Sequence, residues 1–508
     1  MDEPRAHTSR KRAAATALVG ALAFAPGCDT SGAKKTDAER PIEMLVANDP
    51  ETLDPRHATD AVALRTSRLV HAGLVRLDPI TLEPKPYLAR SWRWVDERTL
   101  SVELRDDVTF HSGAPFGARD VAATIRALQS PEVASRHARV VDAIGDVLID
   151  DEHRIRIELR RTHATLLTDL ELPILRESEA SLPPRPNGDL DGLGPFVVAS
   201  REPGTVALVP ANGGALPAPA HPVTIRTVHD ENARALRMHA GRADLVVNGF
   251  SPTLLPALAQ ARGVSISTRP GANLTYMLAR ADRGPLSDER VRKAVAIAID
   301  RERIVRTLLA GHASAASGLL PKAHWAHSEA SALPFDLESA RRMLSEAGAL
   351  PLRLTLLTST DRLRGTIARQ IAQDMASIGV DLEVVPLEFG TMLARLGAGD
   401  FELATLQIPE LTEPNVLRTF LHSSCIPPAG ANRGRVRDAE LDRLLDRGAE
   451  ERDPAARRAV YASLEKLVRD RALFVPLWHE DQVAVTSARA AAFRPSAEGR
   501  WLDLAMMP

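Results

Sequence analysis

Residues 352–385, LRLTLLTSTDRLRGTIARQIAQDMASIGVDLEVV, hold two strand patterns with a helix pattern between them. Apolar and polar residues alternate in 352–357 and in 380–385, as in half-buried strands. The apolar residues between them recur at helical spacing: Ile367, Ile371, Met375 and Ile378. A third strand pattern follows at 401–407. Strand, helix and strand in this order imply right-handed crossovers, so we expect an α/β fold with a largely parallel sheet.

The ends of these strands are the expected place for a ligand. In open sheets of this kind, ligands bind beyond the carboxyl ends of the strands. Two loops follow such ends, residues 358–362 and residues 408–415. The first loop begins with Thr358 and Ser359, whose hydroxyl groups are candidate ligand contacts.

The part of the chain before residue 286 is richer in strand patterns. TLSVEL (99–104) and RIRIEL (154–159) alternate apolar and polar residues. Between them a helix is expected at 120–128, with Asp120 as its N-cap. Later, one helix is expected from a Ser287 cap to Gly311, and another is expected from Asp336 to Gly348.

The N-terminus has the layout of an export signal. A basic head is followed by residues 13–26 without a charge and then by Cys28. The uncharged run is shorter than the roughly 20 residues that a membrane-spanning helix needs. The segment resembles a bacterial lipoprotein signal in which Cys28 is lipidated, although Ala25 stands where Leu is usual. The alternative is an ordinary cleaved signal. We expect a signal peptide at 1–27 and a flexible tether at 28–40.

Composition limits the classes of function. About 480 residues remain after the signal, enough for two or three domains. The net charge is −2, and the 64 Lys and Arg are mixed with the 66 acids, which argues against nucleic acid as a partner. Two cysteines exclude a disulfide framework and a CxxC metal site. With Cys28 lipidated, Cys425 is expected to be a small buried apolar residue.

The sequence contains none of the GxSxG, HExxH, Walker or GxGxxG motifs of common enzymes. His324 and His327 are spaced three apart, but no third ligand is near, so a solvated loop is expected there and no metal site. WHEDQ (478–482) lacks the second histidine of a zincin. We therefore expect a binding protein with no catalytic residues and no cofactor.

Several dispersed segments then resemble one family. GLVRLDPITLEPKPYLARSWRWVDERTLSVELRDDVTFHSGAPFGARDV (73–121), GLGPF (192–196) and LSDERVRKAVAIAIDRERIVRTLLAG (286–311) are similar, in this order, to signatures of the family 5 extracellular solute-binding proteins. These are the peptide/nickel-type substrate-binding proteins of ABC importers. The resemblance extends over about residues 43 to 490.

The resemblance implies a periplasmic-binding-protein-like fold of the class II type. Two α/β lobes are joined by a hinge, and an extra domain is inserted. Domain I is expected from 41–70, 190–270 and 482–508; domain II from 71–189; and domain III from 271–481. The ligand would lie between domains I and III, which close around it, and a permease would recognise the closed form.

The family also implies which residues hold the ligand. Peptide-binding relatives often carry Trp-x-x-Asp-x-x-Asp-Pro after a strand of the second lobe, and QIPELTEP (407–414) occupies that place here. Gln407 then replaces the Trp, Glu410 is the acid that pairs with the ligand's amino group, and Glu413 belongs to the Asp-Pro. A solvated loop position for Glu410 is the open alternative.

Two further positions are candidate ligand contacts: Arg280 departs from the family pattern, and Asn432 matches it. Arg280 replaces an Asn in YMLAR, and it would clamp a carboxylate or phosphate or pair with Asp282 at the surface. Asn432 matches a polar loop position and would line the cleft. Peptide is the default ligand, while nickel complexes, haem, opines and acidic small molecules stay open.

The resemblance therefore implies an exported, monomeric substrate-binding component of an ABC importer in the periplasm. Its partners would be a peptide or small solute, the permease, and the membrane through a lipid on Cys28. Two alternatives stay open. One is a tethered sensor that signals to a membrane kinase, or a degenerate member without a transported ligand. The other is an exported hydrolase.

Overall fold

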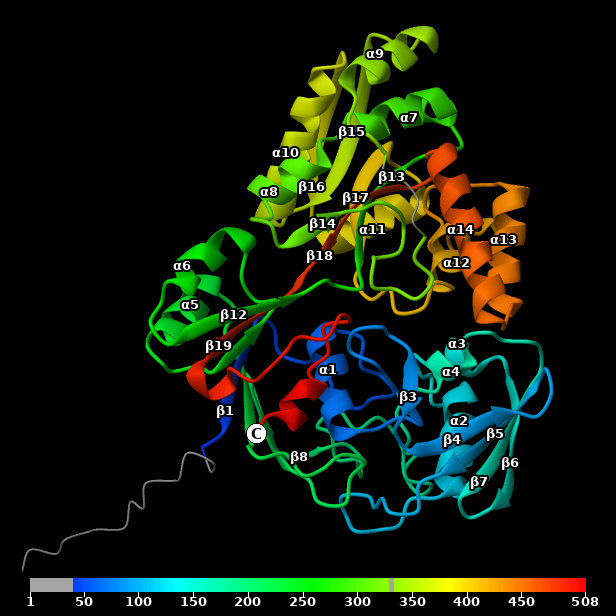
Figure 1. Ribbon diagram of the computed structural model, residues 1–508, viewed down its shortest axis with the longest axis vertical. Helices are drawn as coiled ribbons and strands as arrows, with labels where there is room; N and C mark the ends of the chain where they lie inside the picture. The colour runs from blue at the N-terminus through cyan, green and yellow to red at the C-terminus, as the bar shows by residue number, and fades with distance from the viewer. Residues whose placement is uncertain (1–39, 329–332) are drawn as a thin grey trace, which may run out of the picture.

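The computed structural model describes residues 40–328 and 333–508, and three sheets organise it (Figure 1). The expected signal peptide (1–27), Cys28 and all but the last residue of the expected tether lie outside the described residues. In Figure 1 one lobe occupies the top, and a larger body holding the first and last parts of the chain occupies the bottom.

A seven-stranded mixed sheet in the lower body gathers distant segments, in the order β12-β19-β11-β1-β10-β9-β8. Its strands are β1 (Ile42–Val46), β8 (Phe196–Glu202), β9 (Thr205–Pro210), β10 (Val223–Thr227), β11 (Leu245–Val247), β12 (Val264–Arg269) and β19 (Gln482–Ser487). Strand β1 is parallel to both β10 and β11. The helices of this part are α1 (Ala61–Val70), α5 (Glu231–His239) and α6 (Leu255–Ala259).

A four-stranded antiparallel sheet lies beside it, in the order β4-β5-β7-β6. Its strands are β4 (Ala89–Trp94), β5 (Thr99–Leu104), β6 (Ile144–Asp151) and β7 (Arg154–Leu159), with helices α2 (Ala118–Gln129), α3 (Ala138–Val141) and α4 (Leu166–Asp169) and the hairpin of β2 (Val75–Leu77) and β3 (Pro84–Pro86). The predicted strands 99–104 and 154–159 are confirmed. The Asp120 N-cap is wrong. The cap is Gly117, and Asp120 lies inside α2, where its carboxylate accepts the Gly117 N–H at 2.9 Å.

The upper lobe contains the strand–helix–strand unit predicted at residues 352–385. Strand β15 (Leu352–Ser359), helix α10 (Arg362–Ala376) and strand β16 (Val380–Leu387) follow one another as expected. Strand β15 is parallel to β16 and to β17 (Leu403–Ile408). A largely parallel sheet is wrong, however, because β13 (Leu274–Ala279), β18 (Val475–Glu480) and β14 (Ala313–Ala315) complete the order β14-β18-β13-β17-β15-β16 with antiparallel pairs. Strand β13 precedes the unit and β18 follows it, so neither pairing could be read from the unit itself.

The helices of this lobe differ from expectation at one place. The helix expected from Ser287 to Gly311 is two helices, α7 (Glu289–Ile297) and α8 (Arg301–Thr307). Each starts after an aspartate cap, Asp288 and Asp300, whose side chains accept backbone N–H groups. Helix α9 (Leu337–Glu346) has the expected Asp336 cap. The remaining helices are α11 (Phe389–Ala398), α12 (Val416–Leu421), α13 (Ala439–Glu450) and α14 (Pro454–Asp470).

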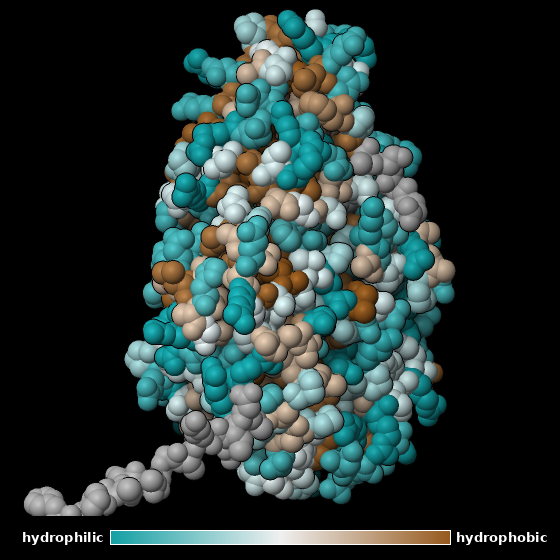
Figure 2. Space-filling model, turned by 60° about the vertical axis from the view of Figure 1, so that its left-hand side comes forward, coloured by the Kyte–Doolittle hydropathy of each residue, from teal (hydrophilic) through white to brown (hydrophobic). Residues whose placement is uncertain are grey.

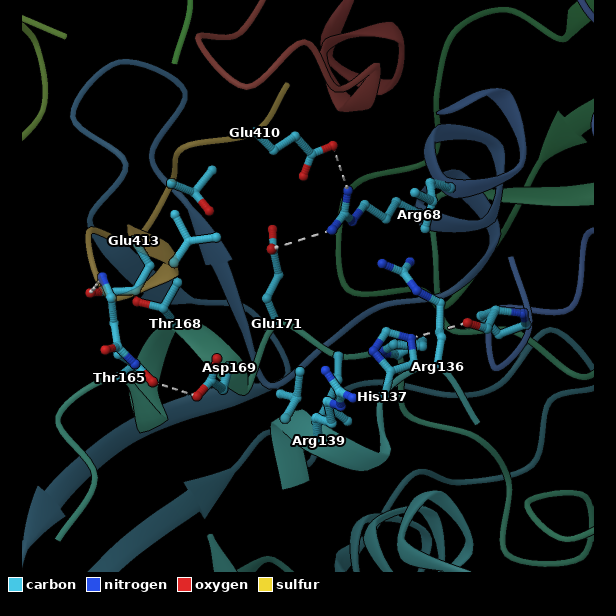
Figure 3. Close-up of a pocket in the computed structure, with 18 of the residues that line it drawn as sticks. Arg68, Arg136, His137, Arg139, Thr165, Thr168, Asp169, Glu171, Glu410 and Glu413 are labelled. Atoms are coloured by element: carbon cyan, nitrogen blue, oxygen red, sulfur yellow. Dashed lines mark hydrogen bonds and ion pairs between the residues drawn. The ribbon is translucent and has the colours of Figure 1, made fainter. Parts of the chain in front are cut away.

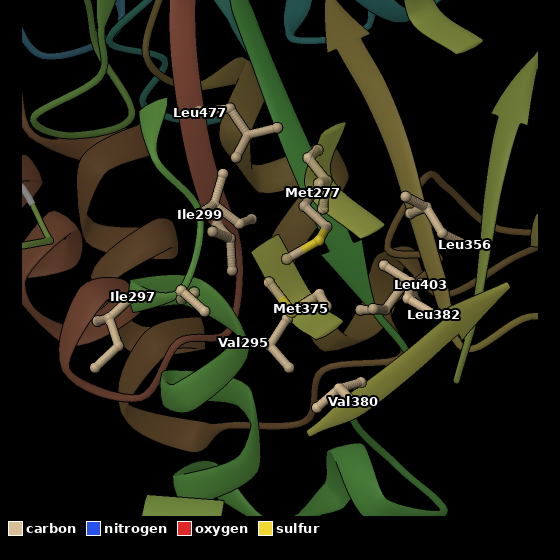
Figure 4. Close-up of a cluster of buried hydrophobic side chains, with 14 of the residues drawn as sticks. Met277, Val295, Ile297, Ile299, Leu356, Met375, Val380, Leu382, Leu403 and Leu477 are labelled. Atoms are coloured by element: carbon tan, nitrogen blue, oxygen red, sulfur yellow. The ribbon is translucent and has the colours of Figure 1, made fainter. Parts of the chain in front are cut away.

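The core of the upper lobe lies between its sheet and the helices on one face (Figure 4). Met277, Leu356, Leu403 and Leu477 from four strands meet Met375 from α10, and each of these side chains is fully buried. Burial of such side chains is worth about 1.5–3 kcal/mol each. A second buried cluster, on the other face of this sheet, includes Ile408, Leu411 and Leu417, and it fixes where the loop at 408–415 begins.

The chain passes between the two lobes twice. It leaves the lower body between β12 and β13 and returns between β18 and β19. The two crossings touch, because the Asn273 side chain donates to the Glu480 carbonyl at 2.7 Å and accepts the Glu480 N–H at 2.8 Å. We propose that the three sheets mark domains I, II and III, with the boundaries expected from the sequence.

A buried ion pair joins the segment after β1 to residues 71–189, which we call the inserted part of the chain. Arg56 and Asp54 are both fully buried, and Arg56 Nη2 donates to Asp54 Oδ2 at 2.6 Å. The same guanidinium donates to the carbonyls of Ala180 and Leu182 at 3.0 and 2.7 Å. The Asp54 carboxylate also accepts the Arg185 N–H at 2.9 Å. The Arg56 guanidinium and the Asp54 carboxylate together hold residues 180–185 against the segment that follows β1.

We expect Arg56→Ala to lower the free energy of unfolding by about 3–5 kcal/mol, because it leaves the buried Asp54 charge without its partner. Urea unfolding followed by circular dichroism measures the change. Arg126→Ala, at an exposed position of α2, serves as the matched control and should change stability by less than about 0.5 kcal/mol. An equal effect of the two substitutions would contradict the role of this pair.

Candidate functional site: a charged cavity between the lobes

A cavity of about 490 Å³ lies where the two lobes and the inserted part meet (Figure 3). Residues from all three contribute to its wall. The charged and histidine side chains among them are Arg68, His71, Arg136, His137, Arg139, His163, Asp169, Glu171, Glu410, Glu413 and Arg500. Arg68 is on α1, while Glu410 and Glu413 lie on the loop that follows β17. The predicted loop at 408–415 is therefore at the cavity.

Glu410 lies opposite two arginines of the lower body. Its carboxylate oxygens are 3.7 Å from Arg68 Nη1 and 3.7 Å from Arg500 Nη2. Arg500 also contacts Glu171, which lies 3.8 Å from Arg68 Nη2. In Figure 3 Glu410 and Glu171 both point toward Arg68. Four charges from three parts of the chain thus form one cluster, and Glu410 is its only member from the upper lobe.

Glu413 also lines the cavity, but its carboxylate is engaged inside its own lobe. It forms a buried ion pair with Arg457 of α14, and Arg457 Nη1 lies 3.4 Å from its second oxygen. Arg457 is itself held by the Gly448 carbonyl at 2.9 Å. This pair fixes the loop on the upper lobe.

Three predicted residues near the strand ends do not line the cavity. Gln407 is on β17 and lies 3.3 Å from the Thr275 hydroxyl, to which its amide donates. Thr358 is fully buried, and its hydroxyl accepts from Thr405 at 3.3 Å. Ser359 is the last residue of β15 and belongs to the strand.

Arg280 and Asn432 also lie away from the cavity. Arg280 follows β13, and its N–H donates to Glu402 at the start of β17, the opposite end of that strand from Glu410. It pairs with Asp282 as one alternative expected, but in a buried position. Asn432 is fully buried and holds its own loop, with its amide donating to Leu421, His422 and Val436 carbonyls.

Two other expectations about single residues are wrong. Cys425 is only half-buried, and the Arg418 guanidinium lies 3.9 Å from its sulfur. His324 is buried instead of solvated, and its Nδ1 accepts the Ala326 N–H at 3.1 Å. Within residues 40–328 and 333–508, no group of three or more His, Cys, Asp or Glu side chains is placed to hold a metal.

The basic wall of the cavity was not expected from the sequence. Arg136, His137 and Arg139 come from a short turn and from α3, within SRHAR (135–139), while Arg500 lies near the C-terminus. The only local signal was the cluster of basic residues in a segment without apolar periodicity. Glu410 is more than 270 residues from Arg136, His137 and Arg139 in the chain, and 90 residues from Arg500.

Four histidines have pKa values lowered by burial, and two of them, His71 and His137, line the cavity. Burial lowers the pKa of His71 and of His324 to about 3 each. Burial lowers the pKa of His137 and of His479 to about 4 each. Burial also raises the pKa of Glu498 to about 7. This shift changes the stability of the protein with pH in the opposite direction to the histidine shifts. The four histidines are neutral in the folded protein at pH 5, whereas they would be protonated in the unfolded chain.

We therefore expect stability to fall as the pH drops from 7 to 5. The folded pKa values lie below the ordinary 6.5, so each histidine contributes stability that is lost below pH 6.5, on the order of 2 kcal/mol by pH 5. The contribution of Glu498 to the stability of the protein grows as the pH falls over the same range, because its pKa is raised, but it is a single group. Denaturant unfolding at pH 7, 6 and 5 measures the net slope. Higher stability at pH 5 than at pH 7 would contradict the neutral buried histidines.

The sequence was compared with known proteins. Residues 83–425 match the family described as "Bacterial extracellular solute-binding proteins, family 5 Middle". The chain belongs to this family. It is thus a solute-binding protein of the kind that serves ABC importers, as predicted.

Individual relatives agree with this assignment. The probable D,D-dipeptide-binding periplasmic protein DdpA of Escherichia coli is 25% identical over 496 residues, covering 90% of this chain and 93% of that protein. Di/tripeptide-binding protein 2 of Pseudomonas aeruginosa is 25% identical, covering 90% and 92%. These relatives are named as binding proteins, not as enzymes.

Solved structures agree with the fold. The ABC transporter substrate-binding protein CtaP of Listeria monocytogenes superimposes with a TM-score of 0.83 at 22% identity, covering 92% of this chain and 98% of that one. NikA of Brucella suis, in complex with Fe(III)-EDTA, gives 0.82 at 21% identity, covering 92% and 99%. The predicted α/β fold of a periplasmic binding protein is confirmed.

Proposed function

We propose that this protein captures a peptide or similar small solute between two closing lobes and delivers it to an ABC permease. The observation that carries the proposal is the composition of the cavity wall. Glu410 of the upper lobe faces Arg68 and Arg500 of the lower body across one space, and Glu413 lines the same space while its carboxylate pairs with Arg457. A volume of about 490 Å³ falls within the roughly 300–1,000 Å³ of small-molecule sites. A solute bound here would touch both lobes at once.

The lobes would close by turning about the two crossings near Asn273 and Glu480. A ligand that contacts both lobes gains those contacts only in the closed form, so its binding shifts the population toward closure. The names of the relatives, a D,D-dipeptide-binding and a di/tripeptide-binding protein, support a short peptide as the solute.

The lobes also touch outside the cavity. Arg452 of the upper lobe lies 3.5 Å above the Trp94 ring of the inserted part and donates to the carbonyls of Asp96 and Glu97 at 3.3 and 3.0 Å. The Ala164 N–H donates to the Ala449 carbonyl at 3.0 Å. These contacts describe a closed arrangement and would break if the lobes separated.

We also propose export and anchoring through a lipid on Cys28, with residues 28–40 as the tether. Anchoring would raise the effective concentration of the protein near its permease. No helix in the described ranges has the length and apolar character needed to cross a bilayer. On the face shown in Figure 2 apolar side chains lie in small scattered groups among hydrophilic ones, which supports a monomer.

Mass spectrometry of solute released from the purified chain, residues 40–508, tests capture directly. We expect a solute of dipeptide size to be released on denaturation and to rebind to the refolded protein in calorimetry, because the cavity accepts a ligand of that size. Absence of any released solute, together with no binding of dipeptides, would refute the proposal.

Substitution of the anchor residue tests tethering. We expect Cys28→Ser to move the protein from the membrane fraction to the soluble fraction of cells that express the full chain, because the thiol is the site of lipid attachment. Cys425→Ser is the matched control and should stay with the membrane. A Cys28→Ser protein that still sediments with membranes would show that the lipid is not the anchor.

A further inference from the structure

Arginines gather around the cavity, with Arg68 at their centre. Burial is the main cause of the lowered pKa of Arg65 and Arg500, and the charge of Arg68 lowers the pKa of both further. Arg139 adds another guanidinium to the wall. Like charges held this close repel one another, so the group is stable only with compensating negative charge.

The acidic side chains of the cavity wall do not supply enough negative charge to balance these arginines. Asp169 is 2.6 Å from both the Thr165 hydroxyl and His163 Nε2, and Glu413 is occupied by Arg457. Neither is directed to the arginine group. Glu171 and Glu410 remain, and they are shared between Arg68 and Arg500.

Two other arginines of the wall have no acid within ion-pair distance in the described ranges, although the charge of Glu410 acts on Arg136. Over the described ranges, the side chains of Arg136 and Arg139 have neither a hydrogen bond nor an ion pair, and both are exposed to the cavity and solvent. Glu498 lies 4.0 Å from Arg500 Nε, but burial raises its pKa to about 7, so it is only partly charged at neutral pH. The arginine group therefore carries an excess of positive charge.

Buried polar atoms at the same place lack partners. His71 lines the cavity with only 3% of its surface exposed, and neither ring nitrogen has a hydrogen bond. Arg500 Nε and Arg68 Nη1 are buried without a hydrogen bond as well. The contacts of Glu410, at 3.7 Å, are longer than the roughly 2.7–2.9 Å of a charged hydrogen bond. Ligand oxygens in the cavity would supply acceptors for the guanidinium N–H groups and for the single N–H of the neutral His71 ring.

We propose that the solute presents a carboxylate or phosphate group to Arg68, Arg136 and Arg500, so that acidic peptides and similar small anions are preferred. This inference rests on the proposed function and specifies its ligand. Glu410 then serves as a counter-charge to Arg68 and Arg500 and does not pair with a ligand amine. Its carboxylate competes with the ligand for the same guanidinium groups.

Calorimetry on residues 40–508, freed of solute by unfolding and refolding, tests the preference with four probes: Asp-Asp, alanyl-phosphoserine, Ala-Ala and Lys-Lys. We expect the better acidic probe to bind at least tenfold more tightly than Ala-Ala, and Lys-Lys to bind most weakly. The affinity of the acidic probe should fall with added salt. The two acidic probes distinguish a carboxylate from a phosphate.

Two substitutions give effects of opposite sign. Arg136→Ala should weaken the acidic probe about tenfold, because it removes a guanidinium that has no structural partner. Arg119→Ala, an exposed arginine of α2, is the control and should leave the affinity unchanged. Glu410→Gln should strengthen the acidic probe several-fold, whereas an amine-binding Glu410 would give weaker binding of ligands with an amino group.

Each result decides the inference. Equal or tighter binding of Ala-Ala or Lys-Lys, an unchanged affinity in Arg136→Ala, or weaker binding in Glu410→Gln would overturn it and leave the capture of a solute standing. If no probe binds, the net charge of the co-purified solute is measured instead. An anionic solute would support the inference, and a neutral or cationic solute would overturn it. If no probe binds and no solute co-purifies, the proposed function fails and the inference fails with it.

Discussion

The meeting of Glu410 with Arg68 and Arg500 is the contact on which the cavity depends. It joins the loop after β17 on the upper lobe to α1 and the C-terminal segment of the lower body. Glu410 and Arg68 each keep about 30% of their side chains exposed. Ion pairs this open are worth about 0–1 kcal/mol. These ion pairs orient the lobes but are too weak to hold them closed. The binding free energy of a solute therefore determines whether the closed arrangement is populated.

The rest of the structure positions this contact. Each lobe has its own buried core, so each can move as a rigid body. The ion pair of Asp54 and Arg56 holds the inserted part against the first lobe, which places Arg136 and Glu171 beside Arg68. The pair of Glu413 and Arg457 fixes the loop on the other lobe. A closing motion then brings together two surfaces that are each built in advance.

The sequence predicted what local patterns determine. The alternation in 352–357 and 380–385, the face of α10 and the Asp336 cap all depend on neighbours within a few residues, and the structure has each of them. The antiparallel half of the upper sheet was missed because β18 reaches β13 from about 200 residues away. The rule for strand ends nominated the loop at 408–415, which lies at the cavity, and the family resemblance singled out Glu410 and Glu413 within it. The same rule also nominated Thr358 and Ser359, which the strand retains. Arg136 and Arg500 carried no local pattern that connects them to Glu410, so only the folded chain shows them together.

Small-angle scattering from residues 40–508, with and without the solute that co-purifies, tests the central claim most directly. If two rigid lobes close around a solute, the solute-free protein should have a larger radius of gyration, and adding the solute should lower it to the value expected for the closed arrangement. The same radius in both samples, at solute concentrations that saturate binding in calorimetry, would contradict the account.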